Sequence, residues 1–159
     1  MKKLLHHIGF FVRLLFVVIA FALASSFAEV EPKAETAERA VVELQESLSQ
    51  SFAYCDVYYF EEMDRIKVRV AVDGLSDLVD EMIAAGYDET FEAWAEYREG
   101  MIAFYDALLE YVRANHREDL TISFHLVNEK NTNRDFISIN GGTGSVFDII
   151  EFNSTMRQK

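Results

Sequence analysis

A glycine-rich stretch near the end of the chain, SINGGTGSVFD over residues 138–148, has the composition of a phosphate-binding loop. A dinucleotide-binding loop of this kind continues through a helix into a second strand, about 30 residues in all. Only 15 residues follow Gly144, so that unit does not fit. A nucleoside triphosphate loop needs Gly-Lys followed by Ser or Thr, whereas Ser145 and Val146 follow Gly144 here. The pattern therefore excludes both nucleotide loops.

The same stretch is typical of a β-hairpin. Asn140-Gly141 is a strong hairpin signal, because both residues adopt positive φ angles at low cost. A competing interpretation is that Ser145 and Asp148 form a capping box and open a helix. We favour a turn followed by a strand over SVFDIIEF, because the residues are mostly β-branched or aromatic and the run is too short for a stable helix.

Nucleophilic catalysis has one candidate set. His125 shares a face of the strand pattern LTISFHLV with Ser123, and Ser138 and Asp148 belong to segments that could lie on neighbouring strands. A serine, a histidine and a carboxylate within hydrogen-bond reach would supply a nucleophile and its general base. No nucleophile elbow or other local signature accompanies these residues. We therefore predict no catalytic residues and keep a small secreted hydrolase, using His125 with Ser123 or Ser138, as the alternative.

Metal and cofactor sites are not predicted. Asn131, Asn133 and Asp135 have the spacing of the first ligands of a calcium loop, but Phe136 stands where that loop needs Gly and Gly142 where it needs Glu. No H-E-x-x-H motif is present, and after the leader the only histidines are His116 and His125. We expect His116 to be a solvated residue at a helix end, where a cation is favourable.

Two groups of residues are candidates for binding. Arg65, Lys67 and Arg69 alternate with apolar residues in RIKVRVAV, so one face of a strand is basic in an otherwise acidic chain. This face could bind an anionic ligand or an acidic partner, or its cations could pair with carboxylates across the sheet.

The second group is a row of three rings, Tyr97, Phe104 and Tyr111, at seven-residue spacing on the longest predicted helix. Seven residues are nearly two turns, so the rings lie along one side of that helix. The row is either buried between the sheet and the first helix, or it is an exposed ridge for a partner or for self-association.

The elements that position these residues follow from periodicity. We predict a helix over about 34–51, and strands in AYCDVYYFEE and RIKVRVAV. A short helix follows, with Ser76 as its N-cap and Gly86 at its end, and then a long helix with Asp88 or Thr90 as its N-cap that ends at His116. Residues 53–62 could instead continue the first helix. Strands in LTISFHLV, FISI and SVFDIIEF complete the order α-β-β-α-α-β-β-β. This order predicts an α+β fold: an antiparallel sheet of about four to five strands with helices packed on one face. In element order it resembles small cystatin-like or NTF2-like domains. This resemblance concerns the fold and says nothing about activity.

Residues 1–28 have the plan of a secretory signal peptide, with Lys2 and Lys3, an apolar run from Leu14 to Ala24, and small residues up to Ala28. We therefore predict that the protein is exported, with residues 29–159 as a single α+β domain in the cell envelope or extracellular space. The basic leader and the small size are similar to those of small exported bacterial proteins.

Charge and cysteine content limit the partners. Without its three basic leader residues the chain has 12 basic and 27 acidic residues, a net charge of −15. A surface this negative repels phosphate backbones and anionic lipids, so we expect no nucleic acid binding, and membrane contact only through the signal segment. Cys55 is the only cysteine, so no internal disulfide can form. The predicted function is a non-enzymatic binding module.

Overall fold

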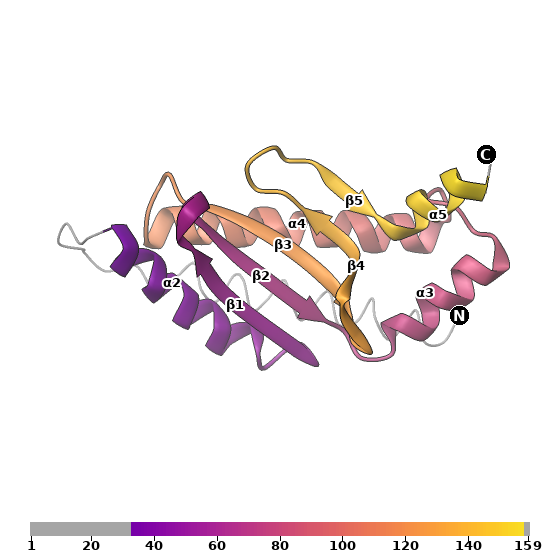
Figure 1. Cartoon of the computed structure of the whole chain (residues 1–159), viewed down its shortest axis with the longest axis horizontal. Helices are drawn as coiled ribbons and strands as arrows, with labels where there is room; N and C mark the ends of the chain where they lie inside the picture. Colours follow the sequence, from indigo (N-terminus) through magenta and orange to yellow (C-terminus); the bar gives the residue numbers. More distant parts are fainter. Residues whose placement is uncertain (1–32, 158–159) are drawn as a thin grey trace.

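The computed structural model describes residues 33–157, which form an α+β fold (Figure 1). The segment predicted to be a signal peptide, residues 1–28, lies outside the described residues. Within residues 33–157 there are four α-helices and one five-stranded sheet, whose strands lie in the order β1-β2-β3-β4-β5. In chain order the elements are α2 (Lys33–Leu48), β1 (Tyr54–Phe60), the 3-10 turn η1 (Glu61–Met63), β2 (Arg65–Ala71), α3 (Leu75–Ala85), α4 (Glu92–Asn115), β3 (Thr121–Asn128), β4 (Asn131–Ile139), β5 (Val146–Asp148) and α5 (Ile149–Arg157).

The sheet is mixed and mostly antiparallel. β1 pairs with β2, β3 with β4, and β4 with β5 in antiparallel fashion, whereas β2 and β3 are parallel. The connection permits the parallel pair, because α3 and α4 separate β2 from β3 and a parallel pair requires a long crossover of this kind. The predicted α+β fold is confirmed, as is a strand over residues 54–60.

One face of the sheet is apolar and covered by helices. Ile66 and Val68 of β2 and Ile122 and Phe124 of β3 point to this inner face and are fully buried. They share a single core cluster with side chains of α2 and α4. The opposite face, which we call the outer face, has no helix over it within residues 33–157, and Figure 1 shows α4 crossing behind the strands. The alternation in β2 explains this division, because every second side chain must point away from the core.

The predicted N-cap of α3 was wrong. Gly74 occupies the N-cap with a φ of 74°, and Ser76 lies buried inside the first turn. The Ser76 backbone N–H and hydroxyl donate to the carboxylate of Glu129, at 3.1 and 2.6 Å. A carboxylate from the β3–β4 turn therefore satisfies the helix start in place of a local side chain. The predicted end at Gly86 is confirmed, with a φ of 80°.

The predicted ends of α4 also need correction. Phe91 is its N-cap and makes no side-chain capping bond, whereas Asp88 accepts a hydrogen bond from the Thr90 N–H at 2.9 Å in a local turn. At the other end, the side chain of His116 is only 4% exposed, with Nε2 3.1 Å from Glu43 Oε2 of α2. His116 is not a solvated helix end, because α2 packs beside it.

The C-terminal strand is shorter than predicted. Only Val146–Asp148 pair with β4, and α5 begins at Ile149. Asp148 Oδ1 accepts hydrogen bonds from the N–H groups of Ile150 and Glu151, at 2.8 and 3.3 Å, and so caps the helix. Burial of Ile149 and Ile150 stabilises a helix that would be marginal alone.

Candidate functional site

The glycine-rich segment is the turn between β4 and β5, and not a phosphate cradle. The N–H groups of Thr143 and Gly144 donate to the Asn140 carbonyl, at 3.2 and 2.7 Å, and the Gly142 N–H donates to Asn140 Oδ1 at 2.9 Å. These amides are therefore occupied within the turn. The predicted position of the positive φ was wrong, because it falls on Gly144, at 68°, rather than on Asn140 and Gly141.

The other two glycines lie close to neighbouring atoms, Gly141 against fixed backbone and Gly142 against the end of a flexible side chain. A Cβ on Gly141 would lie 1.8 Å from the backbone oxygen of Ile122 in β3. A Cβ on Gly142 would lie 2.3 Å from Arg65 Nη2. The turn therefore folds back against β3 and against the first cation of β2, at one end of the outer face.

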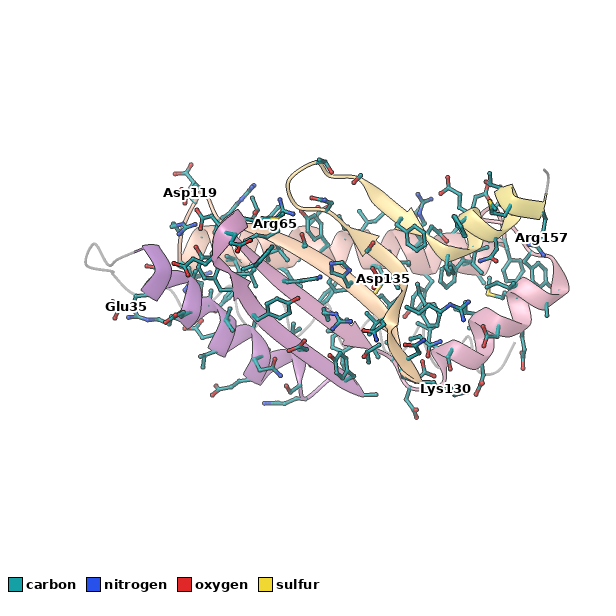
Figure 2. All side chains as sticks on the ribbon, viewed as in Figure 1. Glu35, Arg65, Asp119, Lys130, Asp135 and Arg157 are labelled. Carbon is teal, nitrogen blue, oxygen red and sulfur yellow. The ribbon has the colours of Figure 1, made fainter. Side chains whose placement is uncertain are left out.

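The basic strand face predicted from the sequence lies on the outer face, on β2 next to the edge strand β1. Across β1, β2 and β3, Lys67 lies directly between Tyr58 and Ser123, and Arg69 lies between Asp56 and His125. Figure 2 shows Arg65 toward one end of this face and Asp135 near its middle. The residues of the outer face used below are Asp56, Tyr58, Phe60, Arg65, Lys67, Arg69, Ser123, His125, Asp135, Ser138 and Phe147.

The three cations are neutralised unequally. Arg65 Nη1 donates to Ser123 Oγ and Asn140 Oδ1, both at 3.1 Å, and both acceptors are uncharged. Within the described part of the chain the Lys67 ammonium has no hydrogen bond and no ion pair. Arg69 lies 3.8 Å from Asp56 Oδ2 and also donates to the Thr132 carbonyl. Cross-strand ion pairing therefore accounts for Arg69 and not for Arg65 or Lys67.

His125 does not project alone into solvent. Its Nδ1 lies 2.8 Å from Asp135 Oδ2, and the two side chains are 19% and 29% exposed. Ser138 is the direct cross-strand neighbour of His125. Ser123 is buried, and its hydroxyl accepts the bond from Arg65. Among the described residues neither serine hydroxyl is hydrogen-bonded to His125.

Asp148 is not part of this arrangement, so the predicted grouping with His125 was wrong. It pairs with Ile137, whose side chain belongs to the core, and is itself buried on the inner side. Its carboxylate accepts hydrogen bonds from Trp94 Nε1, at 2.9 and 3.1 Å, and lies 3.5 Å from Arg98 Nε. These contacts tie β5 to α4.

The sequence pattern missed Asp135 as the partner of His125. Register shifts between β3 and β4 lie beside Val127, whose cross-strand neighbour is Asp135. Strict alternation from Ser138 would place Asp135 on the inner side, and a bulge changes which face a side chain occupies. The only sequence signal for Asp135 was that a polar residue comes directly before the apolar segment FISI.

The predicted aromatic row is not a surface. Tyr97 and Phe104 are 8% and 5% exposed, and Tyr111 is partly buried against the core. The Phe104 ring lies 5.9 Å from Phe52, which follows α2, and 5.7 Å from Phe124 of β3. The exposed-ridge interpretation is therefore wrong, because Tyr97 and Phe104 are buried in the core and the Tyr111 hydroxyl donates to Glu43 of α2 at 2.8 Å.

Within residues 33–157 no group of three or more His, Cys, Asp or Glu side chains is arranged to hold a metal ion. No helix in the same range has the length and apolar character needed to cross a bilayer. Cys55 is a half-buried free thiol, and burial raises its pKa.

Comparisons with protein-family models, with curated proteins and with solved structures find no match to this chain.

Proposed function

We propose that this chain is an exported, non-enzymatic interaction module that binds an acidic partner protein through the outer face of its sheet. The observation that carries the proposal is the charge of β2. Arg65, Lys67 and Arg69 share one face in a chain of net charge −12, and neither Arg65 nor Lys67 contacts a carboxylate among the described residues. Such a local reversal of charge attracts an acidic partner and orients it during encounter.

The aromatic residues around these cations support a protein as the partner. Tyr58 lies opposite Lys67, Phe60 lies opposite Arg65, and each ring is 38% exposed. Phe147 on β5 is 37% exposed at the other edge of the face. Tyr, Phe and Arg are enriched in the cores of protein interfaces and supply most of their binding energy. The outer face therefore has a row of cations on β2 with exposed aromatic residues on β1 and on β5, at its two edges.

A direct test is the binding of a fluorescent polyglutamate peptide to the mature protein. We expect Lys67→Glu to weaken binding at least tenfold, because it reverses the charge in the middle of the row of cations. Lys130→Glu is the matched control: it makes the same charge change at an exposed position on the β3–β4 turn and should leave binding within about twofold. Equal losses in the two variants would show that only net charge matters and would remove the outer face from the proposal.

The second candidate is a small hydrolase, and the contact between His125 and Asp135 favours it. A carboxylate that holds one ring nitrogen leaves the other free to accept a proton from a serine, and Ser138 is the neighbour across the strands. The test is covalent labelling with a fluorophosphonate probe. Labelling of Ser138 that disappears in His125→Ala would establish this activity, whereas an unlabelled wild-type protein would exclude a fluorophosphonate-reactive serine.

Export is tested by the N-terminus of the mature protein. The signal-like segment predicts cleavage after Ala28, with Ala24 and Ser26 as alternatives. We expect mass spectrometry of protein recovered outside the cytoplasm to give a chain that begins at Glu29. A chain recovered only with Met1 intact and inside the cell would contradict export.

A further inference from the structure

The side of the molecule opposite the outer face carries a line of carboxylates. Five acidic residues of α4 are exposed. Among the described residues, none of their side-chain carboxylates has an ion pair or a hydrogen bond. They recur at spacings of three, four or seven residues, which places them along one side of the helix. We call this group the acidic stripe: Glu92, Glu96, Glu99, Asp106 and Glu110.

The acidic stripe and the outer face point in opposite directions. α4 packs against the inner side of the sheet through buried side chains that include Met101, Phe104 and Leu108. Its exposed side must therefore face away from the strands, behind the sheet as Figure 1 is drawn. The molecule has a row of cations on one side of its two layers and the acidic stripe on the other.

We propose that the acidic partner of the outer face is a second copy of this chain, which presents its acidic stripe. This inference rests on the proposed function and names the partner. Pairing of two outer faces is disfavoured, because it would bring the row of Arg65, Lys67 and Arg69 close to the same row on the other copy. The charges match only when the back of one copy meets the front of the next, which is a heterologous contact.

The dimensions of the two surfaces agree. Along β2 the cations recur every second residue, so the row from Arg65 to Arg69 is about 13 Å long. The stripe from Glu96 to Glu110 covers 14 residues of helix, about 21 Å, so each cation can face a carboxylate. A helix about 10–12 Å across also fits between the aromatic residues of β1 and Phe147 of β5, which are about 19 Å apart across four strand spacings.

The middle of the stripe allows close approach. Between Glu99 and Asp106 the exposed position on the same side of the helix holds the small residue Ala103. A helix with a small side chain there can lie near the sheet while its carboxylates reach the cations. The net negative charge of each copy opposes this contact, so we expect association that is weak and depends on concentration.

The test uses the mature protein in sedimentation equilibrium, with Lys67→Glu, Asp106→Lys and the double variant that carries both changes. Each single variant places like charges at the interface and should weaken self-association at least tenfold. The double variant, and a mixture of the two single variants, should restore it to within about threefold of wild type. Asp106→Lys is the more informative single change, because the two models predict opposite results. It makes each copy less negative, so an effect of net charge alone would tighten association, whereas the proposed contact would be weakened.

Each outcome of these measurements either supports the contact or overturns it. Weakening by both single changes with recovery in the double variant supports the contact. A wild-type protein that stays monomeric at millimolar concentration overturns it, as does a lack of recovery or tighter association of Asp106→Lys. If the wild type is monomeric but polyglutamate binding still depends on Lys67, only the second copy is excluded and the outer face remains a site for another acidic protein. If both measurements fail, the proposed function fails with them.

Discussion

Asp148 illustrates how one buried carboxylate joins three elements. It ends β5, caps α5, and accepts the indole N–H of Trp94 in α4. Arg98 lies 3.5 Å from it and compensates part of its charge. A carboxylate with this many donors is stable in a buried position, whereas removal of the carboxylate leaves buried donors without a partner.

We expect Asp148→Ala to destabilise the protein by about 2–4 kcal/mol, since it removes a helix cap and leaves the Trp94 N–H unsatisfied. Asp148→Asn should cost less, because an amide oxygen still accepts hydrogen bonds. Urea unfolding at neutral pH measures both. Glu151→Ala is the control, since Glu151 is the exposed partner of Arg98 at 4.0 Å and should change stability by under about 0.5 kcal/mol.

Adjacent glycines in the β4–β5 turn should respond differently to alanine. Gly141→Ala would place a methyl group 1.8 Å from the Ile122 backbone oxygen, which the strand cannot move to avoid. We expect a loss of about 2–3 kcal/mol or more. Gly142→Ala meets only the end of the flexible Arg65 side chain, so the expected loss is about 1 kcal/mol. Equal midpoints in urea unfolding would contradict this assignment.

At the scale of elements, α2 protects the free edge of the sheet. Gln45 Oε1 accepts the Val57 N–H at 2.8 Å, and Gln45 Nε2 donates to the Cys55 carbonyl at 3.2 Å. One side-chain amide thus occupies two backbone groups of β1 that a neighbouring strand would otherwise pair with. Unpaired edges of this kind promote aggregation, and a helix that covers them prevents it.

Gln45→Ala should therefore loosen the contact between α2 and β1. We expect a loss of about 1–2 kcal/mol, and hydrogen exchange at the Val57 amide at least tenfold faster than in wild type. Glu46→Ala, at the exposed neighbouring position, is the control and should leave Val57 exchange unchanged. If Val57 remains equally protected in Gln45→Ala, the bond does not contribute to the edge.

At the scale of the whole molecule, stability should fall at alkaline pH. Burial, with a smaller contribution from the charge of Glu129, raises the pKa of Tyr97 far above its ordinary value of 10.0. Above pH 10 the unfolded chain loses the tyrosine proton while the folded chain keeps it, so unfolding becomes progressively easier. The stabilisation is complete below pH 10 and is lost as pH rises toward the folded-state pKa.

The predicted slope for Tyr97 is about 1.4 kcal/mol per pH unit above pH 10. Tyr97→Phe should remove this part of the pH dependence, measured as the free energy of unfolding between pH 9 and 11. Tyr87→Phe, at a ring that is 43% exposed, is the matched control. Identical alkaline profiles for wild type and Tyr97→Phe would show that ionisation of Tyr97 is not linked to unfolding.

The arrangement of the whole molecule also explains why the cations of the outer face and the carboxylates of the acidic stripe lie on opposite sides. β2 must bury Ile66, Val68 and Val70, so its cations point to the outer face. α4 must bury Met101 and its apolar neighbours, so its carboxylates point the other way. Two local patterns therefore produce one molecule with oppositely charged sides.

Local periodicity was sufficient for much of the fold. The alternation in RIKVRVAV predicted β2 and the face of its cations, because a strand has a fixed two-residue repeat. Gly86 predicted the end of α3, because the left-handed conformation there favours glycine. The hairpin at Asn140-Gly141 was likewise predicted, although the positive φ lies at Gly144.

Features that depend on contacts between distant residues could be identified only in the tertiary structure. The parallel pairing of β2 with β3, the burial of Tyr97 and Phe104, and the contact of His125 with Asp135 all join segments that are far apart or displaced by a bulge. The sequence favoured a strand where α5 lies, because the stability of this helix comes from burial against α3 and β4 and not from its own propensity. The sequence by itself determined which side chains share a face of each element. Only the tertiary structure decided which faces are covered, because burial depends on what the rest of the chain places against them.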